Sequence, residues 1–116
     1  MTGFDIFETA ITRLGLVDSK GSIEQQVPFR KTALSVINEL SEEFCNLPPI
    51  KNLSDEIVLD KKAFSLITYG TAYALSVIMG DIEKQTTMLA IFNAKRTLFL
   101  SEVKKIKDVF PTAKKV

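Results

Sequence analysis

Apolar residues near the start of the chain recur at the spacing of an α-helix. Between Phe4 and Leu14 they stand at positions i, i+3, i+7 and i+10, which places them on one side of a helix. Gly15 suits the left-handed residue that commonly follows a helix. We therefore expect a first helix from about Phe4 to Leu14.

A second helix is expected before the Pro48–Pro49 pair, because proline cannot continue a helix and restricts the residue before it. Two signals compete for its start. Ser22 with Gln25 three residues on can form a capping box, whereas Pro28 is tolerated in a first turn. The predicted apolar face of this helix consists of Phe29, Ala33, Val36, Ile37, Leu40 and Phe44.

The segment that follows, residues 47–60, is long for a connection between two helices. Its "EIVLD" stretch favours a short extended piece. Loops of this length are often functional or bound to a partner, so its role is left open.

Residues 61–79 predict a third helix with Asp60 as its N-cap. Gly80 suits the left-handed position after this helix, and Asp81 suits the N-cap of the next. A joint this short favours antiparallel neighbours.

The fourth helix is predicted from Ile82 to about Val109. Its apolar stripe consists of Met88, Phe92, Phe99, Val103, Ile106 and Phe110. At 1.5 Å per residue this helix spans roughly 42 Å, whereas a compact domain of this length is about 35 Å across. It must therefore break or project, and a projecting amphipathic end needs a partner to cover it.

The whole pattern predicts one all-α domain over residues 1–116, a small bundle of about four helices with a long C-terminal helix.

The stretch from Ala63 to Gly80 carries no formal charge, which raises three possibilities. A membrane span needs about 20 predominantly apolar residues, and the hydroxyl groups here make the stretch too polar. A central helix of the bundle fits better, because a helix that is apolar on nearly every side is normally buried. Gly70 and Ala74 form a line of small residues that favours close approach of a neighbouring helix or of a second copy. We expect self-association.

Composition changes this picture little, but the charge distribution adds a feature. The chain is 46% hydrophobic and 25% charged, as globular domains usually are. Residues 1–60 hold five Lys/Arg and ten Asp/Glu, whereas residues 61–116 hold ten and four. This asymmetry indicates charged partners or head-to-tail self-contact, although attraction between the two halves of one fold explains it equally well.

The sequence offers little for catalysis. Histidine is absent, the glycines are scattered singly, and the single cysteine, Cys45, excludes an intrachain disulfide. We expect a buried inert thiol, no enzymatic activity, no cofactor and no zinc site. A cation on Glu39, Glu42 and Glu43 is less favoured than a solvated acidic helix face. The N-terminal "MTGFDIFETA" has no basic residues and does not resemble a signal peptide.

The C-terminal segment is basic. From Asn93 onward its basic residues are Lys95, Arg96, Lys104, Lys105, Lys107, Lys114 and Lys115. Contact of such side chains with phosphates would be salt-sensitive and independent of nucleotide sequence. A solvated helix face whose basic end complements the helix dipole explains the same residues. A small nucleic-acid-binding module is therefore an alternative function, although no recognition motif accompanies the segment.

Several of these residues follow the pattern of a known family. The run "YGTAYALSVIMGDIEKQTTMLAIFNAKRTLFL" and the later "KDVFP" resemble the head–tail connector (neck, adaptor or head-completion) proteins of tailed bacteriophages and prophages. The residues that carry the pattern are Tyr69, Gly70, Ala72, Gly80, Asp81, Gln85, Phe92, Asn93, Lys95, Arg96, Asp108 and Pro111. "DIFETAITRLGL" and "ALSVINEL" also resemble the first two helices of that group, whereas Pro48, Pro49 and the acidic loop after them match nothing in it.

The resemblance implies a structural all-α protein that forms a ring beneath the portal, joins head to tail and lets DNA pass through its lumen. It implies a place in the virion and, during assembly, in the cytoplasm of the bacterial host. Expected partners are further copies of the chain, the portal and tail-completion proteins and the passing DNA, with no membrane. The residues assigned to a subunit or portal interface are Gly70, Ala74, Lys95 and Arg96. Those assigned to a basic surface facing DNA are Lys104, Lys105 and Lys107. Phe92 is assigned to the core.

Overall fold

A computed structural model describes residues 1–15 and 27–109, with side chains for residues 1–15 and 29–102. This part of the chain forms four helices, α1 (Gly3–Arg13), α3 (Val27–Cys45), α4 (Lys61–Met79) and α5 (Ile82–Val109). The predicted all-α bundle is confirmed. Pro28 lies in the first turn of α3, as one of the two start signals indicated, and the alternative Ser22–Gln25 capping box lies outside the described residues.

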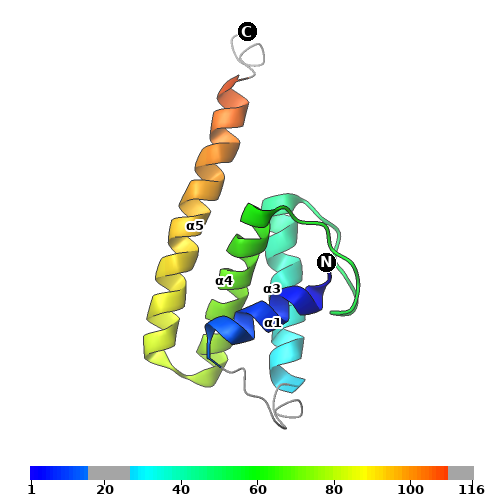
Figure 1. Cartoon of the computed structure of the whole chain (residues 1–116), viewed down its shortest axis with the longest axis vertical. Coiled ribbons are helices and arrows are strands. Elements are labelled where there is room, and N and C mark those ends of the chain that lie inside the picture. The colour runs from blue at the N-terminus through cyan, green and yellow to red at the C-terminus, as the bar shows by residue number, and fades with distance from the viewer. Residues whose placement is uncertain (16–26, 110–116) are drawn as a thin grey trace.

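Helix α4, which carries no charge after Lys62, is the centre of the bundle. Figure 1 shows α5 on one side of α4 and α3 on the other, with α1 crossing α3 and α4. Its buried residues face several directions: Ala63, Leu66, Ile67, Thr68, Gly70, Thr71, Ala72, Leu75 and Ser76. The central-helix interpretation is therefore correct. No helix in the described part of the chain is long and apolar enough to cross a membrane.

Both ends of α4 have the predicted caps. The Asp60 carboxylate accepts a hydrogen bond of 2.8 Å from the Ala63 amide, and Gly80 adopts a left-handed conformation with φ of 72°. Asp81 then accepts a 3.0 Å hydrogen bond from the Lys84 amide and begins α5. Each interaction satisfies a backbone group that a helix end leaves without a partner. The two helices consequently turn back on each other at residues 80 and 81.

Helix α1 buries more residues than the single apolar stripe that the sequence predicted. Phe7, Ile11 and Leu14 are buried as predicted, and Phe4 is half-buried. Buried positions also include Ile6 and Ala10, which the predicted stripe leaves out. The buried surface is wider because α1 packs against both α3 and α4.

The long connection between α3 and α4 is held against the bundle. The Asn38 side chain donates to the Ile50 carbonyl at 2.9 Å and accepts from the Ile50 amide at 2.8 Å. Further along, Leu53 and Ile57 are buried in the hydrophobic core. The connection is thus a structural part of the domain.

This connection also caps the N-terminus of α1. The Phe4 amide donates to the Leu53 carbonyl at 2.8 Å, and the Ile57 amide donates to the Met1 carbonyl at 2.9 Å. An isolated antiparallel bridge joins Thr2 to Glu56, which is how the predicted extended piece is realised. Gly3 permits this approach, because a Cβ there would lie 3.0 Å from the Leu53 carbonyl oxygen.

Gly70 lets two other helices meet over α4. A Cβ built at Gly70 would lie 2.5 Å from Leu40 Cδ1 of α3 and 2.9 Å from Phe92 Cε1 of α5. Beside this point, the Phe44 ring packs edge-on against Phe92 and Phe99 at centroid distances of 6.5 and 5.9 Å. The close approach expected at Gly70 is therefore present within a single chain.

Helix α5 is unbroken and longer than its neighbour. It has 28 residues and α4 has 19, which at 1.5 Å per residue is a difference of roughly 13 Å. Glu102 of α5 pairs with Lys62 at the start of α4, so the turns after Glu102 extend past the end of α4 (Figure 1). The predicted projection is confirmed.

Asn38→Ala is expected to destabilise the fold by about 2 kcal/mol, because two hydrogen bonds worth about 1 kcal/mol each are lost. Chemical denaturation followed by circular dichroism measures the loss. Hydrogen exchange of the Phe4 amide should accelerate in parallel, since that amide bonds to the connection. Ser35→Ala, an exposed change on the same helix, is the control and should change stability by less than about 0.5 kcal/mol. Equal stability of the two variants would contradict the role given to Asn38.

Gly70→Leu is expected to cost about 1–3 kcal/mol, because the new side chain must displace Leu40 and Phe92 from a filled contact. The free energy of unfolding measures it. Adding Leu40→Ala should recover part of the loss, since it removes one of the two obstacles. A fully stable Gly70→Leu variant would show that the contact is not tight.

Candidate functional site

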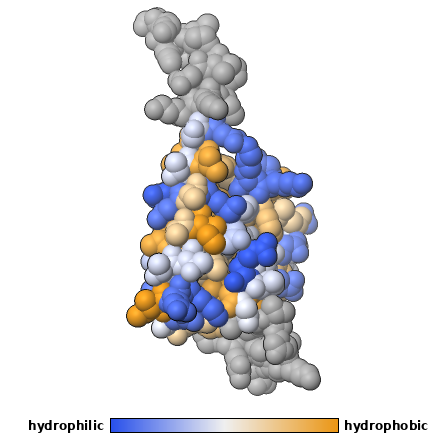
Figure 2. Space-filling view, turned by 60° about the vertical axis from the view of Figure 1, so that its left-hand side comes forward, coloured by the Kyte–Doolittle hydropathy of each residue, from blue (hydrophilic) through white to orange (hydrophobic). Residues whose placement is uncertain are grey.

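The outward side of α5 is unusually poor in charge. Among the exposed residues between Lys84 and Glu102, only Arg96 carries one. Ile82, Leu89 and Leu100 are separated by seven and eleven residues and so share one side of the helix. Ile82 is 75% exposed and Leu100 48%. Figure 2 shows this part of the molecule, where hydrophobic residues form a broken column between hydrophilic flanks.

The residues predicted for an interface have different positions. Gly70 is buried, Ala74 and Lys95 are half-buried, and Arg96 is exposed on α5. The Lys95 ammonium lies 5.3 Å from the centre of the Tyr69 ring, and the Arg13 guanidinium lies 5.9 Å from it. Only Arg96 therefore presents its whole side chain to a partner. The side chains of Lys104, Lys105 and Lys107 lie outside the described residues.

A basic groove lies between α4 and α5. It has a volume of about 200 Å³. Its lining residues are Lys61, Lys62, Ser65, Lys95, Leu98, Phe99 and Glu102. Three lysines therefore line the groove together with apolar Leu98 and Phe99, and Glu102, which pairs with Lys62, is the only acid among the lining residues. We call this feature the lysine groove.

Three carboxylates lie on the side of α3 that faces away from the core. Glu39, Glu42 and Glu43 are exposed, whereas Ala33 and Ile37 of the same helix are buried against the core. The spacing of the acids places them on one face. None of them forms an ion pair with another described residue. We call this face the acidic ridge.

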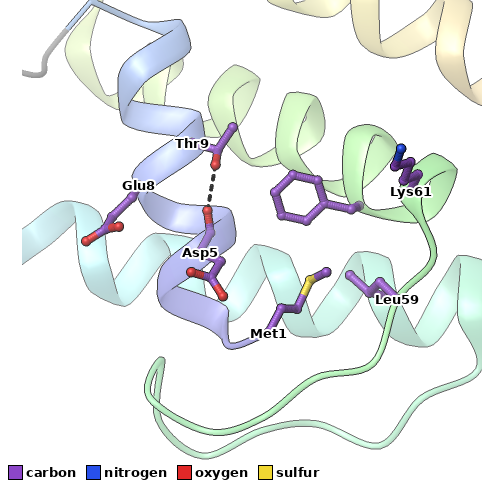
Figure 3. A pocket seen from close by; sticks show the side chains of 7 residues that line it. Met1, Asp5, Glu8, Thr9, Leu59 and Lys61 are labelled. Atoms are coloured by element: carbon purple, nitrogen blue, oxygen red, sulfur yellow. Dashed lines mark hydrogen bonds between the residues drawn. The ribbon is translucent and has the colours of Figure 1, made fainter.

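A wider pocket of about 430 Å³ opens between α1, the end of the connection and the start of α4 (Figure 3). Met1, Leu59 and Phe64 provide its apolar part. The Asp5 carboxylate already accepts a 2.8 Å hydrogen bond from the Thr2 amide at the start of α1. Glu8 and Lys61 also line the pocket and form no ion pair with each other.

Cys45 and the acidic residues do not form a reactive centre in the described structure. Burial raises the pKa of the half-buried Cys45 thiol, and the Asp60 carboxylate raises it further. The thiol is therefore protonated at neutral pH and is a weak nucleophile. Within residues 1–15 and 29–102, no three His, Cys, Asp or Glu side chains gather as a metal site.

The lysine groove was missed by sequence reasoning. Lys61 and Lys62 begin one helix, whereas Lys95, Leu98 and Phe99 lie more than thirty residues later in another. The run "DKK" at a helix start was visible, and the predicted antiparallel turn at residues 80 and 81 places residues about equally far from it side by side. That turn is the signal that could have located the part of α5 beside Lys62.

No protein-family model matches the chain, and comparison with curated proteins and with solved structures gives no significant match. The resemblance to phage connector proteins therefore stays a prediction.

Proposed function

We propose that this chain is a structural subunit of a phage or prophage head–tail connector, which assembles as a ring between portal and tail and lets DNA pass. The observation that carries the proposal is the outward side of α5, which is nearly uncharged and exposes Ile82, Leu89 and Leu100. A solvated helix normally carries charged residues on that side. A partner that covers the column accounts for its composition.

Two further features support this proposal. The last turns of α5 extend beyond the bundle, which gives the subunit an arm that reaches a portal or tail protein. Opposite charges lie on separate surfaces, the lysine groove and the acidic ridge, and this suits contacts between unlike faces of neighbouring subunits. In this proposal the subunit has a mechanical role and holds the head and tail together around the channel.

A nucleic-acid-binding module is the second candidate. The fold adds Lys61 and Lys62 to Lys95 at the end of the bundle from which the basic C-terminal segment continues. Lysines gathered in this way would contact phosphates without reading sequence.

Ile82→Glu with Leu100→Glu is expected to abolish self-association with little change in the melting temperature, because these side chains are 75% and 48% exposed in the monomer. Burying an apolar side chain of this size in an interface contributes on the order of 1–2 kcal/mol, and a buried charge opposes it. Sedimentation velocity and native mass measured across protein concentration provide the readout. Val58→Glu, at an 81% exposed aliphatic residue in the connection, is the control and should associate like the wild type.

A wild-type chain that stays monomeric at every concentration, and that fails to bind isolated capsid portals, would contradict the connector proposal.

The second candidate predicts direct binding of duplex DNA by the free monomer. Its affinity should fall steeply between 50 and 200 mM salt, by about tenfold or more if several phosphates are neutralised. Fluorescence anisotropy with two unrelated duplexes measures this, and Lys61→Glu should weaken binding to both equally. An affinity that does not change with salt concentration would exclude this mode of binding.

A further inference from the structure

We propose that the acidic ridge of one copy docks into the lysine groove of the next. This inference rests on the proposed ring assembly and specifies which two surfaces meet. The groove is lined by exposed Lys61 and by Lys95, whose ammonium lies over the Tyr69 ring, and neither lysine forms an ion pair with a described residue. The ridge supplies three exposed carboxylates that are also without ion-pair partners in the described structure. The groove therefore carries an excess of positive charge, with three lysines against Glu102, and the ridge carries only negative charge.

The two surfaces lie at the same level along the bundle. Lys62 at the start of α4 pairs with Glu102, which fixes the height of the groove. Phe44, next to the ridge, packs against Phe99 in the groove at a centroid distance of 5.9 Å, which fixes the height of the ridge. Because both surfaces have the same height, a neighbour that keeps its axis roughly parallel brings one opposite the other.

The surfaces face away from each other on one copy. The groove opens toward the side of α1, because Lys61 also lines the pocket formed with α1 residues. The ridge lies on the side of α3 that is turned away from buried Ala33 and Ile37. A contact between unlike, oppositely directed surfaces is head-to-tail, and it closes into a ring when the rotation per subunit allows.

The groove suits a helix that carries both acid and apolar groups better than it suits a phosphate backbone. Leu98, which lines the groove, is 65% exposed. A partner with apolar surface would bury this side chain, and that burial would stabilise the contact. Val36 lies one turn before Glu39 and two turns before Glu43, on the same side of α3, and can provide that surface.

Two charge-reversed variants test the contact. Glu42→Lys with Glu43→Lys changes the ridge, and Lys61→Glu with Lys95→Glu changes the groove. Each variant alone should associate at least about tenfold more weakly than the wild type, because like charges then face each other. An equimolar mixture of the two should recover association, since each ridge then faces an opposite groove. Sedimentation at low salt measures this, and the melting temperature of each variant confirms folding. If Lys95→Glu disturbs folding, Lys61→Glu replaces the groove variant.

Matched controls carry the same change in net charge elsewhere. They are Glu8→Lys with Glu83→Lys for the ridge, and Lys31→Glu with Lys51→Glu for the groove, all at exposed or rim positions. Both controls should associate like the wild type. Carbodiimide cross-linking of mixed ¹⁵N-labelled and unlabelled wild-type protein should join Glu42 or Glu43 to Lys61 or Lys95 between two copies.

The outcomes separate this inference from the proposal beneath it. The docking contact is overturned if both variants associate as well as the wild type, or if the mixture fails to recover association. Either result leaves the connector proposal unaffected. Groove reversal that abolishes DNA binding and leaves association intact assigns the groove to DNA and overturns the contact as well. A wild-type chain that never associates with itself and also fails to bind isolated capsid portals contradicts both.

Discussion

The structure depends on the burial of one helix, α4, by three others. Helices α1, α3 and α5 all pack against it, and its buried residues face more than one of them. Such packing requires small side chains where neighbours meet, and Gly70 provides this beneath Leu40 and Phe92. A larger residue there would separate α3 from α5, and the edge-on contacts of Phe44 with Phe92 and Phe99 would be disturbed.

The three buried hydroxyl groups of α4 are compatible with this position because the helix itself satisfies two of them. The Thr71 hydroxyl donates to the Ile67 carbonyl at 2.8 Å, and the Ser76 hydroxyl donates to the Tyr73 carbonyl at 2.6 Å. Such bonds remove the cost of burying a hydroxyl group. Thr68 Oγ1 has no hydrogen-bond partner among the described residues, so burial there is less favourable. A stretch too polar for a membrane is thus suited to the centre of a small bundle.

The packing around α4 leaves several surfaces of the other helices exposed to solvent. A core built around α4 uses one side of α5, and the opposite side remains exposed with Arg96 as its only charge between Lys84 and Glu102. The connection from α3 to α4, which was a candidate for partner binding, is instead used to cap α1 and to fill the core with Leu53 and Ile57. The surfaces left for a partner are therefore the outer side of α5, the lysine groove and the acidic ridge.

Local signals in the sequence were enough to predict the four helices and most of their ends, because caps and periodicity act over a few residues, although the start of α3 was left between two signals. Asp60, Gly80 and Asp81 act through neighbours within a few residues, so their roles were predictable. Of the candidate site, the sequence indicated Arg96 and the acidic face of α3. Packing of the whole chain was needed to show that Gly70 meets Leu40 of α3 and that Phe44 of α3 contacts Phe99 of α5. These contacts join residues on different helices, and the register between helices follows from the packing of the whole core, which no local pattern encodes.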